Sequence, residues 1–419
     1  MRLYVQDRQG PRRPIAIDQA PLGQGGEGRI HAVRGDRTRV IKLYADPRPE
    51  RRAKVEAMLA CPLATPAGSA GSAGFAWPQG IVTDSLGAFR GFTMRRIDTA
   101  QYFALETLLI PAARAKAGLP GDGPTSYRFR VKVARNIAAV IAQAHRAGQA
   151  VVDIKPMNIF IHRVSAQVVI VDCDGCRING PGGVFPAAVA TEEYLAPEFH
   201  GKVHLADRRQ DLFALAMVVF RLLNNDLYPM NGIPTDADAP ASHAERIRAN
   251  LLTVNPAAPI RQHAKSIQDM LPAELMQMFR NAFSHVQPLR PSAQHWADHL
   301  AKFEQSLTRC KRVRGHVALP AGCPWCIMAD PAAASVIGTQ GSARPRRRAN
   351  WAAATARLLG IPVAILLCLG LAVALYAAPL AARDRSSWHG TAPAENRVEG
   401  GGDSGGVRRT PRLVSGHEH

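Results

Sequence analysis

The chain has 419 residues, enough for two or three domains, and 47% apolar with 20% charged residues indicates a folded rather than a disordered protein. Lysine and arginine total 52 against 33 acidic residues, a net charge of +19, but no aromatic-rich basic module predicts nucleic-acid binding. Seven unevenly spaced cysteines do not form the pattern of a disulfide framework. The opening Met1-Arg-Leu-Tyr-Val has no apolar run, so no signal peptide is expected.

A glycine-rich stretch comes first along the chain. Gly23, Gly25 and Gly28 occupy the first, third and sixth positions of a G-x-G-x-x-G-x-I pattern that closes at Ile30. Glycine lets backbone amides approach a phosphate closely. The stretch lies between strand-like runs rather than opening a helix, which argues against a dinucleotide-binding fold. Lys42 then interrupts an apolar strand, where it needs an anionic partner unless it is a solvated edge residue.

The next segments predict a small set of further elements. A helix is expected over 50–60, a flexible loop over 62–76 and two strands over 81–83 and 89–94. An amphipathic helix is expected over 126–147 and ends near a glycine that suits a helix C-terminus.

The stretch Val151-Val152-Asp153-Ile154-Lys155-Pro156-Met157-Asn158 brings an acid, a base and an amide together, and a second apolar run ends at Asp172. Such groups on two strand ends suit phosphoryl transfer, which requires positioning and charge neutralisation. Asp153 would accept the proton of a substrate hydroxyl, and Lys155 would face the transferred phosphate. Asn158 and Asp172 would hold Mg²⁺ through oxygen ligands. A chance sequence in a surface turn is the alternative.

Three later segments extend this pattern. Thr191-Glu-Glu-Tyr194-Leu-Ala196-Pro197-Glu198 is followed by an apolar helix that opens at Asp211, and Arg290-Pro291-Ser292-Ala293 begins another helix. In this order, the segments resemble the motifs of the protein kinase family, including its H-R-D-x-x-x-x-N, D-F-G and A-P-E elements. The resemblance implies an α+β, bilobal, protein-kinase-like fold, with a β-rich N-lobe over 1–98 and a helical C-lobe over 99–305. It favours a protein kinase over a small-molecule kinase, with ATP and Mg²⁺ as cofactors and a protein as substrate.

The resemblance also implies roles for single residues. Lys42 would contact the ATP phosphates and pair with a glutamate on the 50–60 helix, Glu56, with Glu50 as a weaker alternative. The hinge that meets adenine would run from Met94 through Arg96 to Ile97. The family's catalytic loop corresponds to 151–158, and its activation segment to the stretch that follows Asp172 and ends at Glu198. Other expected contacts are Thr191 with Asp153 and Lys155, Asp211 with the backbone of the catalytic loop, and Arg290 with Glu198.

Three departures from the family pattern favour an alternative function. Val151 and Val152 stand where the family has His and Arg, and Cys173 stands in place of the Phe of D-F-G. The strand phase favours Asp172 as the metal ligand, with Asp174 second. A nucleotide-binding pseudokinase that scaffolds partners at the membrane is therefore the competing hypothesis. The retained acid, lysine and amide groups favour catalysis, because a scaffold needs none of them.

Cys310, His316, Cys323 and Cys326 follow the lobes, within a segment 306–330. Four soft ligands at this spacing suit a tetrahedral structural Zn²⁺. A redox C-x-x-C pair and unliganded cysteines are the alternatives; Cys173 and Cys176, in the catalytic site, are read as unliganded.

The C-terminal part predicts a membrane anchor. A basic linker is expected over 331–357, and 358–382 carries no charge over a length that spans a bilayer core of about 30 Å. A buried helix of a soluble domain is the alternative. Arginines are more numerous before the span than after it, which places the kinase in the cytosol. The tail over 383–419 is expected to be disordered.

The zinc knuckle and the D-I-K-P-x-N loop, with the D-x-D motif and Trp77-Pro78, resemble one bacterial subfamily of such kinases. Its members accompany a PP2C-type phosphatase and a von Willebrand factor A (VWA) domain protein. The resemblance therefore implies these two partners, and a single-pass location in the bacterial inner (cytoplasmic) membrane.

Overall fold

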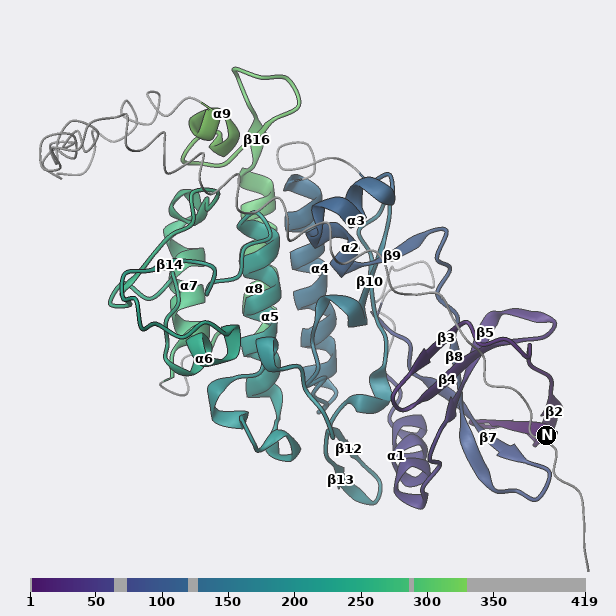
Figure 1. Cartoon of the computed structure of the whole chain (residues 1–419). Helices are drawn as coiled ribbons and strands as arrows, with labels where there is room; N and C mark the ends of the chain where they lie inside the picture. Colours follow the sequence, from purple (N-terminus) through teal and green to yellow (C-terminus); the bar gives the residue numbers. More distant parts are fainter. Residues whose placement is uncertain (1, 64–73, 120–126, 286–289, 330–419) are drawn as a thin grey trace, which may run out of the picture. The chain divides into compact units, whose positions relative to one another are not determined.

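The computed structural model describes residues 2–63, 74–119, 127–285 and 290–329. A sheet-rich N-lobe precedes a helical C-lobe, as Figure 1 shows from purple to green. The expected kinase-like bilobal fold is therefore confirmed. Within the described residues, no helix is long and apolar enough to cross a membrane. The predicted linker 331–357, membrane helix 358–382 and tail 383–419 lie outside the described residues.

The N-lobe is built on a seven-stranded antiparallel sheet in the order β2-β1-β7-β8-β5-β4-β3. Its strands are β1 (Leu3–Asp7), β2 (Arg13–Ile15), β3 (Gly23–Gly25), β4 (Gly28–Val33), β5 (Asp36–Tyr44), β7 (Pro78–Asp84) and β8 (Phe89–Arg95). Side chains alternate between the two faces of a strand, so Val40 and Ile41 enter different apolar clusters. Lys42 consequently shares the face of Val40, which lines a cleft.

Helix α1 (Pro49–Ala60) confirms the helix expected over 50–60. It buries Val55, Met58 and Leu59, and its first turn contains a proline, whose missing N–H costs nothing there. The indole Nε1 of Trp77 donates to the carbonyl of Met58 at 2.9 Å. This bond fixes the C-terminal end of α1 to the chain that leads into β7.

A second sheet, in the order β6-β11-β10-β9, links the two lobes of the chain. Its strands are β6 (Gly74–Phe75), β9 (Tyr102–Ala104), β10 (Ile159–His162) and β11 (Val168–Ile170). Strand β6 pairs in parallel with β11, so the loop expected over 62–76 ends in a strand instead. Two residues give no local strand signal, and the pairing with a distant segment decides their structure.

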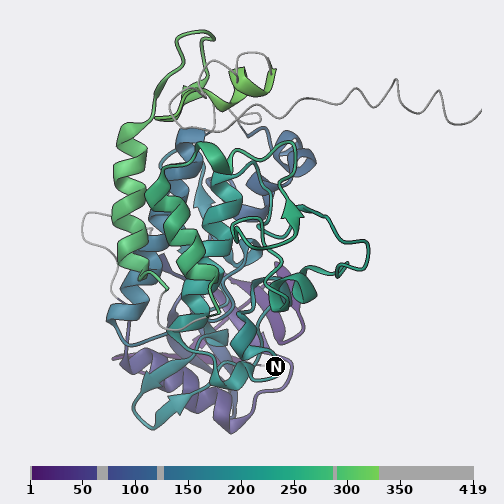
Figure 2. The same ribbon diagram turned by 90° about the vertical axis from the view of Figure 1, so that its left-hand side faces the viewer.

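The C-lobe is organised around α5 (Arg208–Leu223), which is buried on nearly every side. Such an all-round apolar helix is expected at the centre of a domain. Helix α4 (Tyr127–Arg146) packs against α5 and against α8 (Ala293–Ser306), and Figure 2 shows α8 along one side of the lobe. The remaining α-helices of this lobe are α2 (Leu105–Leu109), α3 (Pro111–Lys116), α6 (His243–Arg248) and α7 (Ala273–Phe283).

Short elements complete the C-lobe. The 3₁₀ turns are η1 (Pro156–Asn158), η2 (Cys173–Gly175), η3 (Glu192–Tyr194), η4 (Pro197–Phe199), η5 (Val203–Leu205) and η6 (Gln268–Met270). A hairpin of β12 (Ile178–Gly180) and β13 (Gly183–Phe185), and an antiparallel pair of β14 (Ile233–Pro234) and β15 (Ile260–Arg261), belong to it as well. The C-terminal knuckle comprises β16 (Thr308–Arg309), β17 (Val317–Ala318) and α9 (Pro324–Ala329), at the end of α8 (Figure 1).

Arg290 ties the end of the activation segment to the C-lobe core, as expected. Its Nη2 lies 3.0 Å from Oε2 of Glu198, and its Nε donates to the carbonyl of Ala282 at 2.9 Å. The Arg290 side chain is 2% exposed and that of Glu198 is 28% exposed. Burial acts to raise the pKa of Glu198, but the hydrogen bonds from Arg290 outweigh it and leave the pKa below its ordinary value.

We expect Arg290→Met to lower the free energy of unfolding by about 3 kcal/mol at neutral pH, because it removes the guanidinium that bonds both oxygens of a partly buried carboxylate. The loss should shrink as the pH falls through the lowered pKa of Glu198, since protonation removes the charge that Arg290 stabilises. Urea unfolding at several pH values measures both effects. Arg280→Met is the control, because Arg280 bonds Gln277 on the surface; an equal loss in that variant would contradict the assignment.

Candidate active site

The first turn of α5 holds the catalytic loop in place through the side chain of Asp211. The carboxylate of Asp211 is fully buried and accepts bonds from the amides of Val151 at 2.8 Å and Val152 at 2.6 Å. Its Oδ2 also lies 2.8 Å from Nε2 of His145. Val152 has a φ of 65°, a strained value for a β-branched residue. The bonds to Asp211 hold that conformation, which confirms the position expected for Asp211.

Four side chains of the predicted site form one hydrogen-bonded group. Asp153 Oδ1 accepts from the amide of Thr191 at 3.0 Å and from its hydroxyl at 2.8 Å. Lys155 Nζ donates to Thr191 Oγ1 at 3.0 Å and pairs with Asp153 Oδ2 at 2.8 Å. The amide nitrogen of Asn158 donates to Asp153 Oδ2 at 3.1 Å, which leaves its carbonyl oxygen available for a cation. The structure brings these four residues together, while their catalytic roles stay predictions.

A cleft of about 690 Å³ lies beside this group, a volume typical of small-molecule sites. Its polar part is formed by the glycine-rich stretch with Lys42, Asn158 and Asp172. Its apolar part is suited to a flat base and is formed by Ile30, Val40, Ala76, Met94, Phe160 and Val171. Of the predicted nucleotide-binding residues, Gly23, Gly25, Gly28, Ile30, Lys42, Met94 and Arg96 line the cleft.

The structure contradicts the predicted pairing of Lys42 with Glu56 or Glu50. Glu56 is half exposed and pairs with Arg52 at 2.8 Å, one turn away on α1, and Glu50 is exposed. Lys42 Nζ instead lies 2.7 Å from Asp172 Oδ1 and 2.8 Å from both oxygens of Asp174. Burial acts to lower the pKa of Lys42, but these two carboxylates together raise it above its ordinary value.

Asp172 and Asp174 differ in their access to the cleft. Asp172 lines the cleft with a side chain that is 50% exposed, whereas the side chain of Asp174 is 4% exposed. Only a carboxylate that reaches the cleft could share a cation with a bound phosphate. The geometry therefore agrees with Asp172 as the candidate Mg²⁺ ligand, and Asn158 lines the same cleft. That assignment stays a prediction.

Sequence reasoning missed two residues next to Lys42. Tyr44 donates its hydroxyl to Asp174 Oδ2 at 2.7 Å, and Glu27, inside the glycine-rich stretch, lies 3.3 Å from Lys42 Nζ. The signal for Tyr44 was present, because a residue two positions after Lys42 shares its face of the strand. Glu27 carried no such signal, since a loop side chain has no fixed phase.

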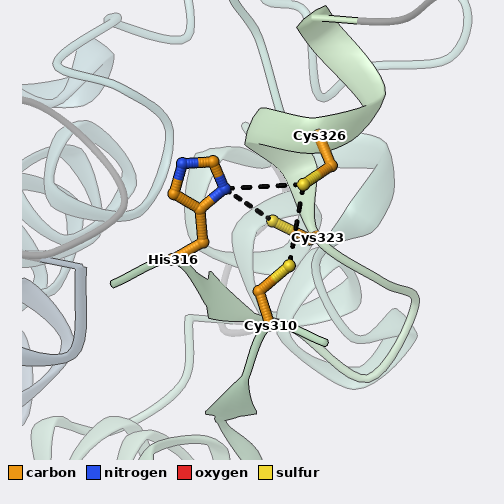
Figure 3. A group of neighbouring side chains, drawn as sticks. All are labelled: Cys310, His316, Cys323 and Cys326. Atoms are coloured by element: carbon orange, nitrogen blue, oxygen red, sulfur yellow. Dashed lines mark hydrogen bonds between the residues drawn. The ribbon is translucent and has the colours of Figure 1, made fainter. Parts of the chain in front are cut away.

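A second candidate site lies in the C-terminal knuckle. Cys310, His316, Cys323 and Cys326 point toward one another in Figure 3, with their ligand atoms within 4.8 Å of each other. His316 Nδ1 is 3.5 Å from the sulfurs of Cys323 and Cys326, and the Cys310 and Cys326 sulfurs are 3.6 Å apart. A tetrahedral zinc with sulfur ligands at about 2.3 Å would separate the sulfurs by about 3.8 Å. The four cysteine and histidine ligands fit this geometry.

The pKa values of two thiols in the knuckle, those of Cys310 and Cys323, are shifted in opposite directions. Backbone amides of Val313 and Arg312 lower the pKa of the Cys310 thiol to about 7, whereas burial raises that of Cys323 to about 12. A bound cation has to deprotonate Cys323, because zinc coordinates the thiolate. The indole of Trp325 packs edge-on against Tyr127 of α4, with ring centroids 5.3 Å apart, and so joins the knuckle to the C-lobe.

Fold and site together define a protein-kinase-like domain. The family model described as "Protein kinase domain" matches residues 119–300, which contain Asp153, Lys155, Asn158, Asp172 and Thr191. The curated relatives to which the chain is similar are themselves named as protein kinases.

The curated relatives come from two bacteria. The chain is 28% identical over 321 residues to protein kinase YegI of Escherichia coli K12, an alignment that covers 73% of this chain and 48% of YegI. YegI of E. coli O157:H7 gives the same identity over 323 residues. A probable serine/threonine-protein kinase of Streptomyces coelicolor, SCO3848, is 33% identical over 91 residues, which are 21% of this chain and 13% of SCO3848. The chain thus spans about half the length of the YegI proteins.

Proposed function

We propose that this chain transfers the γ-phosphoryl group of ATP to serine or threonine hydroxyls of proteins. The observation that carries the proposal is the closed group of Asp153, Lys155 and Thr191 beside a cleft lined by Lys42 and Asp172. A pseudokinase scaffold would need the cleft but not the acid–lysine–hydroxyl group. This group therefore favours catalysis over the competing hypothesis.

Each residue has a role that follows from its position. Asp153 accepts the proton of the attacking hydroxyl, and Thr191 and Asn158 hold its carboxylate in place. Lys155 stabilises the negative charge of the transferred phosphoryl group. Asn158 and Asp172 would hold Mg²⁺, which neutralises phosphate charge when bound. Lys42 and the amides of the glycine-rich stretch bind the remaining phosphates.

The test is transfer of ³²P from γ-labelled ATP by the full chain to itself and to a proteome extract. Acid hydrolysis of the labelled proteins then identifies the phosphorylated amino acid. Label on serine or threonine that requires Mg²⁺ supports the proposal. Nucleotide binding without any label on protein would favour the scaffold.

The activation segment gives a reason to expect that kinase activity does not require a phosphate on residues 173–196. Thr191 and Tyr194 carry the only hydroxyls between residues 173 and 196. The Thr191 hydroxyl bonds Asp153, and the Tyr194 hydroxyl is enclosed by Arg221 at 2.7 Å and Tyr228 at 3.1 Å. Val152, where the family has a phosphate-binding arginine, is completely buried and cannot pair with an anion.

We therefore expect phosphatase treatment of the purified kinase, followed by removal of the phosphatase, to leave the initial rate on an added substrate unchanged. Mass spectrometry of the 173–196 peptide, before and after treatment, is the control that shows whether phosphate was removed from this segment. A large loss of rate that tracks loss of phosphate at Thr191 or Tyr194 would refute the expectation.

Three further assignments are proposed on narrower support. The knuckle is proposed to bind a structural Zn²⁺, because its ligand atoms fit a tetrahedral site. Segment 358–382 is proposed as a single membrane span from its uncharged length, which places the protein in the bacterial inner membrane with a cytosolic kinase. A PP2C-type phosphatase and a VWA-domain protein are proposed partners on the motif resemblance alone.

A further inference from the structure

Lys42 and Asp174 form the most deeply buried ion pair near the cleft in the part of the chain that the structure describes. Their side chains are 6% and 4% exposed, and Nζ lies 2.8 Å from both carboxylate oxygens. Asp172 also contacts Nζ at 2.7 Å, but half of its side chain is exposed to the cleft. A buried pair is screened far less by water than a half-exposed one, so Asp174 restrains the ammonium more strongly.

Asp174 is itself held in place from two sides. The Tyr44 hydroxyl donates to Oδ2 at 2.7 Å from the same strand face as Lys42. The backbone of Asp174 lies in the tight turn η2, closed by bonds from the amides of Gly175 and Cys176. Cys173, the first residue of this turn, and Cys176, the residue after it, are buried in the core and anchor the turn. The carboxylate therefore comes from the start of the activation segment, two residues after the candidate metal ligand.

Among the residues that the structure describes, no carboxylate of helix α1 contacts Lys42 as Asp174 does. The side chain of Glu56 is half exposed and pairs with Arg52 on the same helix. The helix is held where it is by the bond from Trp77 to Met58, by a bond from Lys54 Nζ to the carbonyl of Pro186, and by Ala57 against Gly180 of β12. Bringing Glu56 to Lys42 would require α1 to turn against these contacts.

We propose that Asp174 is the positioning residue of Lys42. In this protein, a carboxylate in the turn η2 holds the Lys42 ammonium in place of the glutamate that was expected on helix α1. The inference rests on the proposed function of the cleft in binding ATP. Asp174 holds the ammonium with both oxygens, so Asp172 can serve as a metal ligand without leaving Lys42 unpaired. The geometry of Lys42 then depends on the turn that opens the activation segment and not on the orientation of α1.

The experiment measures the dissociation constant of Mg·ATP for the full chain by calorimetry, with melting temperature as a folding check. We expect Asp174→Asn to weaken binding about tenfold, because Lys42 loses its fixed partner. The same substitution in a Lys42→Met background should have almost no effect, since Asp174 acts through Lys42. Tyr44→Phe, which keeps the carboxylate, should weaken binding in the same direction by a smaller factor.

The control is Asp84→Asn, which removes a buried N-lobe carboxylate that pairs with Arg90 away from the cleft. Its dissociation constant should equal that of wild type. An equal weakening by Asp174→Asn in the Lys42→Met background would overturn the proposal, because the effect would then not pass through Lys42. So would a tenfold weakening by Glu56→Gln with none by Asp174→Asn.

The binding cycle does not depend on phosphoryl transfer. Should wild type bind Mg·ATP but transfer no phosphate, the proposed function fails while the cycle still decides the role of Asp174. If wild type transfers phosphate, the ratio of kcat between Asp174→Asn and wild type is a second test of the positioning role of Asp174. A loss of kcat that Lys42→Met does not mask would again overturn the positioning role.

Discussion

Replacing Asp153 by asparagine is expected to reduce phosphoryl transfer roughly 10²–10⁴-fold, the usual contribution of a positioned general base. Asparagine has nearly the same shape and can still accept the bonds from Thr191, but it cannot take up the proton of the attacking hydroxyl. Asp153 does not line the cleft, so the affinity for ATP should stay at the wild-type value. The measurement pairs the initial rate of ³²P transfer with a calorimetric dissociation constant.

A matched control is Asp298→Asn, which changes the same functional group on the exposed face of α8, where it bonds Gln294. This variant should transfer phosphate at the wild-type rate. A wild-type rate in Asp153→Asn would remove Asp153 from the role of base. A joint loss of rate and nucleotide affinity would instead indicate that the substitution disturbs the loop held by Asp211.

The second large effect concerns the knuckle. The full chain, purified without chelators, is expected to hold one zinc ion per molecule, and Cys323→Ser combined with Cys326→Ser should release it. Structural zinc contributes about 10–16 kcal/mol to folding in isolated zinc-finger peptides, so the knuckle should unfold without its ligands. The contact of Trp325 with Tyr127 would be lost with it, and the melting temperature of the kinase domain should fall.

Metal analysis, tryptophan fluorescence and thermal unfolding check this expectation together. Cys61→Ser is the control, because Cys61 is an unpaired, partly buried thiol outside the cluster; it should keep the zinc. Protein without zinc would refute the metal site. A mass lower by two hydrogens, restored by a reductant, would identify the redox pair that was the alternative.

Local pattern alone was enough for most of the catalytic centre. Asp153, Lys155 and Asn158 lie in one short loop between α4 and β10, so their closeness along the chain keeps them close in space. The apolar run around Lys42 predicted a buried lysine unless the strand was a solvated edge, and the amphipathic spacing of apolar residues predicted α4 to within a residue at each end. The spacing of four thiol and imidazole groups likewise predicted a cluster, which the structure places within 4.8 Å.

Tertiary packing decided which partner each group finds. The sequence offers Glu56 at a suitable distance along the chain from Lys42, yet the rotation of α1 about its axis is set by Trp77, Pro186 and β12, which no local pattern encodes. Strand β6 and the turn η2 are equally non-local, because each is too short to have a preference of its own and takes its shape from β11 and the buried core. Burial of charge depends on all the chain segments that meet at one point. The sequence alone therefore determined that a buried Lys42 needs an acid, and only the folded chain decided that Asp172 and Asp174 contact it in place of Glu56.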